Sequence, residues 1–268
     1  MAAAGSPARG RHRIPGRQPI LRIRAACASR KNENMATSSY RVKNIWKTLQ
    51  GEGFFAGRPA VFCRLVGCNM WSGYEEDRAR DAQRHGADCP RWCDTDFRKE
   101  DSRDLTAESL AREMQDVGGE ITFCVLTGGE PLLQADAPLI RALHDEGFQV
   151  AVETNGTVAL ADAFTDPGRE LHAPDWITCS PKLQEDRLEL ERFDELKLVV
   201  PDYRPADYTR FAERASEHKV SGRRVPLLWL QPEDGPRLEE AKREAVQLAL
   251  AHPTWRAGVQ SHKVLDLE

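Results

Sequence analysis

The sequence predicts an α/β protein in which six parallel strands and their connecting helices form an incomplete barrel, of the (β/α)6 TIM-like type. Two observations lead to this prediction. Short apolar runs alternate with stretches of helical pattern, which is typical of a parallel sheet. Polar clusters follow most of the apolar runs, as expected where active-site residues gather at the carboxyl ends of barrel strands. A chain of 268 residues is long enough to bury such a core.

Six strands rather than eight favour a barrel that does not close. The expected strands are residues 59–66, 121–126, 148–152, 176–179, 196–200 and 225–230. Four helices are expected at residues 105–117, 132–146, 205–219 and 236–251. The first has Thr106 as a candidate N-cap, the second ends at Gly147, and the last two begin with proline, which the first turn tolerates.

Five polar clusters, far apart in the sequence, follow these strands. They are Cys68 after the first strand, residues 127–130 after the second, 153–156 after the third, 180–182 after the fourth and 231–234 after the sixth. Because the carboxyl ends of parallel barrel strands share one face, we expect the five clusters to converge there as an active site.

Charge divides the chain at about residue 34. Residues 1–34 carry eight Arg or Lys residues and one acid, whereas the remaining chain carries 30 basic and 41 acidic residues. We therefore expect a basic N-terminal extension, 1–34, and one core domain, 35–268. The extension is interpreted as sequence preceding a true start at Met35, with a transit peptide or a nucleic-acid tail as alternatives. The acidic core argues against nucleic-acid binding.

The chain is expected to work in the cytoplasm. No apolar run approaches the roughly 20 residues that a membrane helix needs. Seven cysteines, an odd number scattered over a long chain, do not form the pattern of a disulfide framework and suit a reducing compartment.

Three cysteines stand out: Cys68, then Cys89 after twenty residues, then Cys93 after three more. Three thiolates can hold three irons of a four-iron cluster and leave the fourth iron open. Thiolates select iron–sulfur or zinc, so the alternative is a structural zinc site with a fourth ligand such as His85. The other core cysteines lie within apolar strands and are expected to be inert buried thiols: Cys63, Cys124 and Cys179.

Gly128, Gly129 and Glu130 follow an apolar strand and offer backbone amides and a charge to a small zwitterion. Alone, the pattern also suits a strand-to-helix turn. Together with the three cysteines it indicates radical chemistry on S-adenosylmethionine. Arg64 lies within an apolar run and needs an anion, either a substrate carboxylate or an internal acid.

As an ordered set, seven motifs resemble those of the 7-carboxy-7-deazaguanine synthase family, radical S-adenosylmethionine enzymes of queuosine and deazapurine biosynthesis. They are LQGEG at 49–53, RLVGCN at 64–69, CDTD at 93–96, TGGEP at 127–131, SPK at 180–182, QP at 231–232 and SHK at 261–263. The likeness runs from about residue 40 to the C-terminus. Many radical enzymes space these cysteines as Cys-x3-Cys-x2-Cys, and some members of this family have a longer first loop before a Cys-x2-Cys pair. This chain departs from both patterns, with twenty residues and then three between its cysteines.

The resemblance implies a role for each matching residue and no catalytic group beyond the cluster and cofactor. The [4Fe–4S] ligands are Cys68, Cys89 and Cys93, and the Mg²⁺ ligand is Thr95. The S-adenosylmethionine contacts are Trp92, Cys93, Asp94, Gly129, Glu130, Ser180, Pro181, Lys182, Gln231, Pro232, Glu233 and Asp234. The substrate contacts are Leu49, Gln50, Gly51, Arg64, Thr127 and the C-terminal Glu268.

The reaction implied by the resemblance converts 6-carboxy-5,6,7,8-tetrahydropterin to 7-carboxy-7-deazaguanine and ammonia. A 5′-deoxyadenosyl radical would remove hydrogen from C6 of the pterin, the ring would contract, and S-adenosylmethionine would be regenerated. Magnesium would hold the substrate carboxylate. The expected electron donor is a flavodoxin or ferredoxin, and the expected assembly is a homodimer.

Two alternatives belong to other functional classes. One is an activase that makes a glycyl radical on a partner protein, against which the residues His262 and Lys263 and the position of Thr95 favour the pterin reaction. The other is a zinc-stabilised protein that binds RNA through its basic extension. A brown, oxygen-sensitive preparation would exclude the second alternative.

Overall fold

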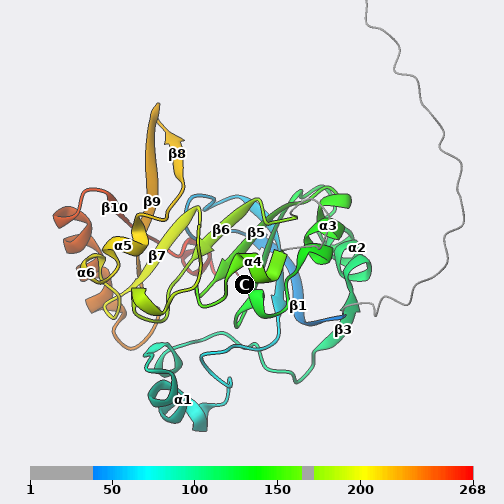
Figure 1. The fold of residues 1–268 in the computed structure, drawn as a ribbon, viewed down its shortest axis with the longest axis horizontal. Coiled ribbons are helices and arrows are strands. Elements are labelled where there is room, and N and C mark those ends of the chain that lie inside the picture. Colours follow the sequence, from blue (N-terminus) through cyan, green and yellow to red (C-terminus); the bar gives the residue numbers. More distant parts are fainter. Residues whose placement is uncertain (1–38, 165–171, 268) are drawn as a thin grey trace, which may run out of the picture. The chain divides into compact units, whose positions relative to one another are not determined.

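The computed structural model describes residues 39–164 and 172–267, which contain one mixed sheet with helices packed along it (Figure 1). The predicted extension, 1–34, lies outside the described residues. The strands are β1 Ser39–Leu49, β2 Pro59–Leu65, β3 Arg103–Thr106, β4 Phe123–Gly128, β5 Gln149–Thr154, β6 Trp176–Cys179, β7 Glu195–Val200, β8 Glu217–Val220, β9 Arg223–Pro232 and β10 Trp255–Ala257. The helices are α1 Arg78–His85, α2 Ala107–Gly118, α3 Ala137–Asp145, α4 Leu160–Phe164, α5 Thr209–Ala212, α6 Leu238–Ala251 and α7 Ser261–Val264.

The six predicted strands form the parallel centre of the sheet. Strands β2, β4, β5, β6, β7 and β9 pair in that order, each parallel to the next. Strand β10 extends the row beside β9, while β1 runs antiparallel to β2 and β3 antiparallel to β1. Within the described residues the row ends at β10 and β3 without closing. The prediction of an incomplete α/β barrel is confirmed.

Helices α2 and α3 cover the sheet near β1, β2 and β5, and α6 packs on β9 and β10 at the other end (Figure 1). Thr106 caps α2 as predicted, because its side-chain oxygen accepts from the Ser109 amide at 3.2 Å. Helix α3 begins later than predicted. Asp136 is its N-cap and accepts from the Leu139 amide at 3.1 Å, while residues 131–133 form a separate helical turn.

The predicted helix at 205–219 is wrong. Only a helical turn at 205–207 and the four-residue α5 form there, and the Ser216 amide then donates to the Phe193 carbonyl at 2.8 Å. The chain continues as β8, which pairs with β9 in a hairpin that projects from the sheet in Figure 1. Ser221 and Gly222 form the turn with φ values of 49° and 84°, as two-residue hairpin loops require.

A segment of 37 residues, 66–102, leaves the sheet between β2 and β3 and contains helix α1. In Figure 1 α1 lies apart from the central strands. Helix α1 packs on the helical turns at 75–77 and 89–91, and the second of these carries Cys89. Across the described residues, no helix combines the length and the apolar character that spanning a membrane requires.

Candidate active site

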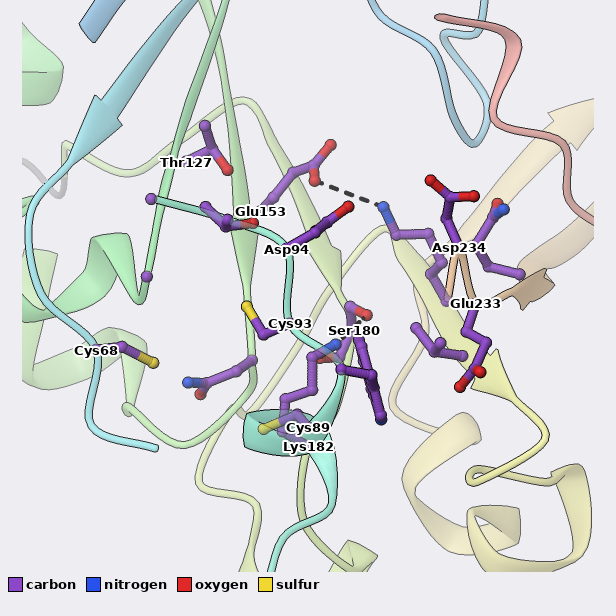
Figure 2. Close-up of a pocket in the computed structure, with 18 of the residues that line it drawn as sticks. Cys68, Cys89, Cys93, Asp94, Thr127, Glu153, Ser180, Lys182, Glu233 and Asp234 are labelled. Carbon is purple, nitrogen blue, oxygen red and sulfur yellow. Dashed lines mark hydrogen bonds and ion pairs between the residues drawn. The ribbon is translucent and has the colours of Figure 1, made fainter. Parts of the chain in front are cut away.

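Polar side chains from five strand ends line one cavity, called here the cysteine cavity (Figure 2). The strand-borne clusters at 127–130, 153–156, 180–182 and 231–234 each contribute to it, and so does Cys68. The predicted site residues on its wall are Cys68, Cys89, Trp92, Cys93, Asp94, Thr95, Thr127, Gly129, Ser180, Lys182, Gln231, Pro232, Glu233 and Asp234. The structure therefore brings together the clusters that the sequence placed at strand ends.

Cys68 faces the cavity from one side, and Cys89 and Cys93 face it from the other (Figure 2). The Cys93 amide donates to the Cys89 carbonyl at 2.9 Å, so the chain makes one helical turn between them. Residues four apart on such a turn lie on the same face. The three-residue gap therefore presents both thiols to the same space.

Burial changes the chemistry of these thiols. It raises the pKa of Cys68 to about 11 and that of Cys89 to about 12. Burial also raises the pKa of Cys93, against hydrogen bonds from the Thr95 amide and hydroxyl. The negative thiolate is thus disfavoured unless a bound cation offsets the loss of solvent.

The donor set suits an iron–sulfur cluster better than a single ion. Within the described residues no three His, Cys, Asp or Glu side chains are arranged to hold one metal ion together. A four-iron cluster needs no such convergence, because each cysteine binds a different iron. Three thiols that line one cavity fit such a cluster. The cysteines at 63, 124 and 179 are buried within strands, as predicted.

Gly128 and Gly129 hold the loop of Cys68 against the end of β4. The Glu130 amide donates to the Gly67 carbonyl at 2.9 Å. A Cβ built on Gly129 would lie 2.2 Å from that carbonyl oxygen and 2.6 Å from the Cβ of Cys68. Only glycine permits this approach. The Gly-Gly pair therefore places the backbone next to a cluster cysteine.

Glu130 does not line the cysteine cavity. Its carboxylate accepts from the Leu132 amide at 2.9 Å, the Thr154 hydroxyl at 2.8 Å and the Asn155 amide at 2.7 Å. Burial raises the pKa of Glu130 to about 7, although these donors oppose the shift. The side chain joins the ends of β4 and β5, and its predicted contact with S-adenosylmethionine stays a prediction. Pro181 is likewise buried and absent from the cavity wall.

One charged network fixes the far wall of the cysteine cavity. The indole of Trp92 donates to Asp202 at 2.9 Å, and Arg237 binds the same carboxylate at 2.8 and 3.0 Å. Arg237 also donates to the buried Glu233 at 2.6 Å. The Nζ of Lys182 donates to the Ser180 hydroxyl at 2.8 Å, and burial lowers the pKa of this lysine. Asp202 and Arg237 were not predicted as site residues.

A second cavity adjoins the first and is called here the substrate cavity. Five predicted substrate contacts line it: Leu49, Gln50, Gly51, Arg64 and Thr127. The guanidinium of Arg64 lies 4.9 Å from the ring centre of Trp46, which also lines this cavity. Residues that line both cavities form the shared wall: Glu52, Asp94, Thr95, Thr127, Glu153 and Gln260.

Lys197, on β7, pairs with both glutamates of the shared wall. Its Nζ binds Glu52 and lies 3.5 Å from Glu153, the contact dashed in Figure 2. Burial raises the pKa of Glu52, but Lys197 overrides burial and lowers it to about 2. Lys197 and Glu52 were not predicted as site residues. Glu153 was expected at the active-site face, in the cluster 153–156, but without an assigned role.

The C-terminal segment covers the substrate cavity. The Ser261 amide donates to the Gly51 carbonyl at 2.8 Å, and a Cβ on Gly51 would lie 1.8 Å from the imidazole of His262. Lys263 pairs with Asp94 at 3.0 Å and also with Asp234. The segment therefore joins the two cavities. The predicted substrate contact at Glu268 lies outside the described residues.

Comparison with known proteins identifies the same chemistry. A profile of the Radical SAM superfamily matches residues 88–245. The 7-carboxy-7-deazaguanine synthase of Bradyrhizobium diazoefficiens is 42% identical over 236 residues, which covers 85% of this chain and 99% of the relative. The enzyme of that name from Bordetella pertussis is 44% identical over 238 residues, with the same coverage.

A solved structure gives the same relationship. The crystal structure of QueE from Escherichia coli superposes with a TM-score of 0.55 at 26% identity, covering 84% of this chain and 95% of that chain. Because the curated relatives are matched over almost their whole length at more than 40% identity, the chain belongs to the 7-carboxy-7-deazaguanine synthase family of the radical S-adenosylmethionine superfamily.

Proposed function

We propose that the chain converts 6-carboxy-5,6,7,8-tetrahydropterin to 7-carboxy-7-deazaguanine and ammonia, using S-adenosylmethionine catalytically. The observation that best supports this is the shared wall between the two cavities. It gives a cofactor in the cysteine cavity and a substrate in the substrate cavity a common boundary at Thr95, Thr127 and Glu153. A radical enzyme needs such a boundary, because the hydrogen atom passes directly between cofactor and substrate.

In this proposal Cys68, Cys89 and Cys93 hold three irons of a [4Fe–4S] cluster. When bound, the cluster and S-adenosylmethionine supply the radical that removes a hydrogen atom from the substrate. Because burial disfavours the free thiolates, cluster assembly is expected to release their protons.

S-adenosylmethionine is proposed to bind the remaining wall of the cysteine cavity. Gly129 lines the cavity beside Cys68, where the methionine end is proposed to lie. The other proposed contacts are Trp92, Asp94, Ser180, Lys182, Gln231, Pro232, Glu233 and Asp234. The network of Trp92, Asp202 and Arg237 holds this wall in place.

The pterin is proposed to bind in the substrate cavity. Arg64 is the cation placed to pair with its carboxylate, and the loop at 49–51 supplies backbone groups to its ring. Lys197 lowers the pKa of Glu52 and so keeps its carboxylate ionised and able to accept hydrogen bonds. The C-terminal carboxylate of Glu268 remains a proposed contact.

Magnesium is proposed to bind beside Thr95. A hydroxyl oxygen on the shared wall, next to the carboxylate of Asp94, offers the hard oxygen ligands that this ion prefers. Its proposed role is to hold the substrate carboxylate. We also propose that a flavodoxin or ferredoxin donates the electron. The chain is proposed to form a homodimer and to work in the cytoplasm.

Anaerobic turnover tests this function. The full chain, reconstituted with iron and sulfide, receives reductant, Mg²⁺, S-adenosylmethionine and 6-carboxytetrahydropterin, and mass spectrometry follows the products. We expect 7-carboxy-7-deazaguanine without net consumption of S-adenosylmethionine. If 5′-deoxyadenosine accumulates without deazaguanine, the substrate is wrong. If a cluster-loaded sample gives neither, the proposed function is wrong.

A further inference from the structure

All three cluster cysteines lie in the 66–102 excursion between β2 and β3, outside the sheet. Cys68 lies three residues after β2, while Cys89 and Cys93 follow helix α1. The strand pairing that places Thr127 or Glu153 does not extend to this segment. A backbone hydrogen bond from the Gly67 amide to the Phe97 carbonyl, at 3.0 Å, joins the loop of Cys68 to the chain after Cys93. Side-chain contacts add to it in fixing the distance from Cys68 to the other two thiols.

Arg78, the first residue of α1, holds the turn that carries Cys89 and Cys93. Its Nη1 donates to the Pro90 carbonyl at 2.6 Å, and its Nη2 donates to the Cys93 carbonyl at 3.1 Å. These two carbonyls belong to the helical turn that presents both thiols. One planar guanidinium thus binds the turn at two points, a geometry that a lysine cannot reproduce.

The same guanidinium also contacts the segment of Cys68. Its Cζ lies 4.2 Å from the ring centre of Trp71, three residues after that cysteine. The Trp71 side chain is buried at 6% exposure and lines the cysteine cavity. The third donor, Nε, binds Glu75 at 2.6 Å, which fixes the plane of the guanidinium. Arg78 therefore bridges both cysteine-bearing segments.

The first turn of α1, which carries Arg78, is itself bound to the chain that follows Cys68. The buried carboxylate of Asp81 accepts from the Ser72 amide at 2.9 Å, which holds the first turn of α1 against the chain that follows Cys68. The helix ends at Gly86, whose φ of 61° suits glycine. The first turn of α1 is thus held to both cysteine-bearing segments.

We propose that Arg78 is a positioning residue for the iron–sulfur cluster, tying the segment of Cys68 to the turn of Cys89 and Cys93. The long spacing between the first two cysteines then has a physical role, since it contains the helix that carries this arginine. The inference rests on the proposed function, because it presumes a cluster on the three cysteines.

Iron retention tests the role of Arg78. The variants Arg78→Ala and Arg78→Lys and the control Arg84→Ala, an exposed residue of the same helix, are reconstituted in the full chain. The measurements are iron per chain, the rate of iron release to a chelator, and the electron paramagnetic resonance spectrum of the reduced cluster with and without S-adenosylmethionine. Thermal unfolding of the cluster-free chains shows whether each variant folds.

We expect Arg78→Ala to release iron roughly tenfold faster than the wild type, since the two hydrogen bonds from the guanidinium to the turn of Cys89 and Cys93 are lost. The rate of iron release from Arg78→Lys should lie between those of the wild type and Arg78→Ala, and the rate from Arg84→Ala should match the wild type. The spectrum of Arg78→Ala should broaden, while the melting of its cluster-free chain changes little. A folded Arg78→Ala with wild-type release and spectrum would overturn the inference. A wild type without a four-iron cluster would contradict the proposed function and the inference together.

Discussion

Thr127, Glu153 and Gln231 reach the site from strands, whereas Cys89, Cys93 and Thr95 reach it from a segment outside the sheet. The first group is fixed by the register of parallel strands, whose hydrogen bonds run along the buried centre of the fold. The second group is fixed by side-chain contacts, above all those of Arg78 and Trp92.

The difference shows where this architecture tolerates change. Strand-borne positions cannot shift without shifting the sheet, while a loop-borne cysteine can change its spacing if new contacts replace the old ones. The two groups meet where Gly129 packs against the loop of Cys68, so that contact joins the sheet to the cluster. Substitutions in each region should therefore fail in different ways.

Replacing one cysteine in each region should give the largest contrast. Cys93→Ala should abolish turnover and prevent loading of a four-iron cluster, while the chain stays folded. Cys179→Ala, a buried thiol of β6, should keep full iron content and activity and lose about 1 kcal/mol of stability. Iron analysis, turnover and urea unfolding measure the pair. Retained activity in Cys93→Ala would contradict the cluster assignment.

Gly129→Ala should strain the junction between the two regions. The new Cβ would lie 2.2 Å from the backbone oxygen of Gly67, and a backbone oxygen cannot rotate away. We therefore expect the free energy of unfolding to fall by about 1–3 kcal/mol and less cluster to be bound. Gly235→Ala is the matched control, because its Cβ would have its nearest neighbour at 3.4 Å. Urea unfolding compares the two. Equal stability of both variants would show that the glycine contact is dispensable.

Thr95→Ala should separate magnesium binding from cluster binding. We expect normal iron content and a roughly tenfold higher Mg²⁺ concentration for half-maximal turnover, with Thr95→Ser close to the wild type. Turnover is measured over a magnesium series. If magnesium stimulation is the same in the alanine variant, Thr95 is not a ligand.

The buried Glu130 should give the smallest effect, visible as pH dependence. A carboxyl whose pKa rises from 4.5 to about 7 on folding binds its proton more tightly in the folded chain. Its contribution to stability is therefore largest below pH 4.5 and falls as the pH rises towards 7.

In Glu130→Gln this pH dependence of stability should disappear. The free energy of unfolding at pH 5 should fall by about 1–2 kcal/mol, because the Asn155 amide loses its acceptor. Urea unfolding of the cluster-free chain at several pH values measures both. An unchanged slope between pH 4.5 and 7 would show that Glu130 does not titrate there.

The strand-borne half of the site was predictable from the sequence. Apolar runs bounded by polar clusters identify parallel strands, and the rule that carboxyl ends share a face brings residues 127–130 and 231–234 together. The role of Glu130 was not predictable, because only the structure shows that three donors occupy its carboxylate.

The rest depended on contacts that sequence patterns do not encode. The predicted helix at 205–219 failed because pairing with β9 outweighs helical periodicity after Ala215, although Ser221-Gly222 signalled a hairpin. Lys197 lies within an apolar strand, and its partners come from residues 145 and 44 positions away along the chain. Long-range ion pairs of this kind leave no local signal.

We propose that three cysteines of the 66–102 excursion bind one cluster with an open iron. Electron paramagnetic resonance of the reduced, reconstituted chain, recorded before and after addition of S-adenosylmethionine, tests it most directly. We predict about four irons per chain and a signal that shifts on addition, because the cofactor binds the iron without a cysteine. A signal that S-adenosylmethionine leaves unchanged would contradict the claim.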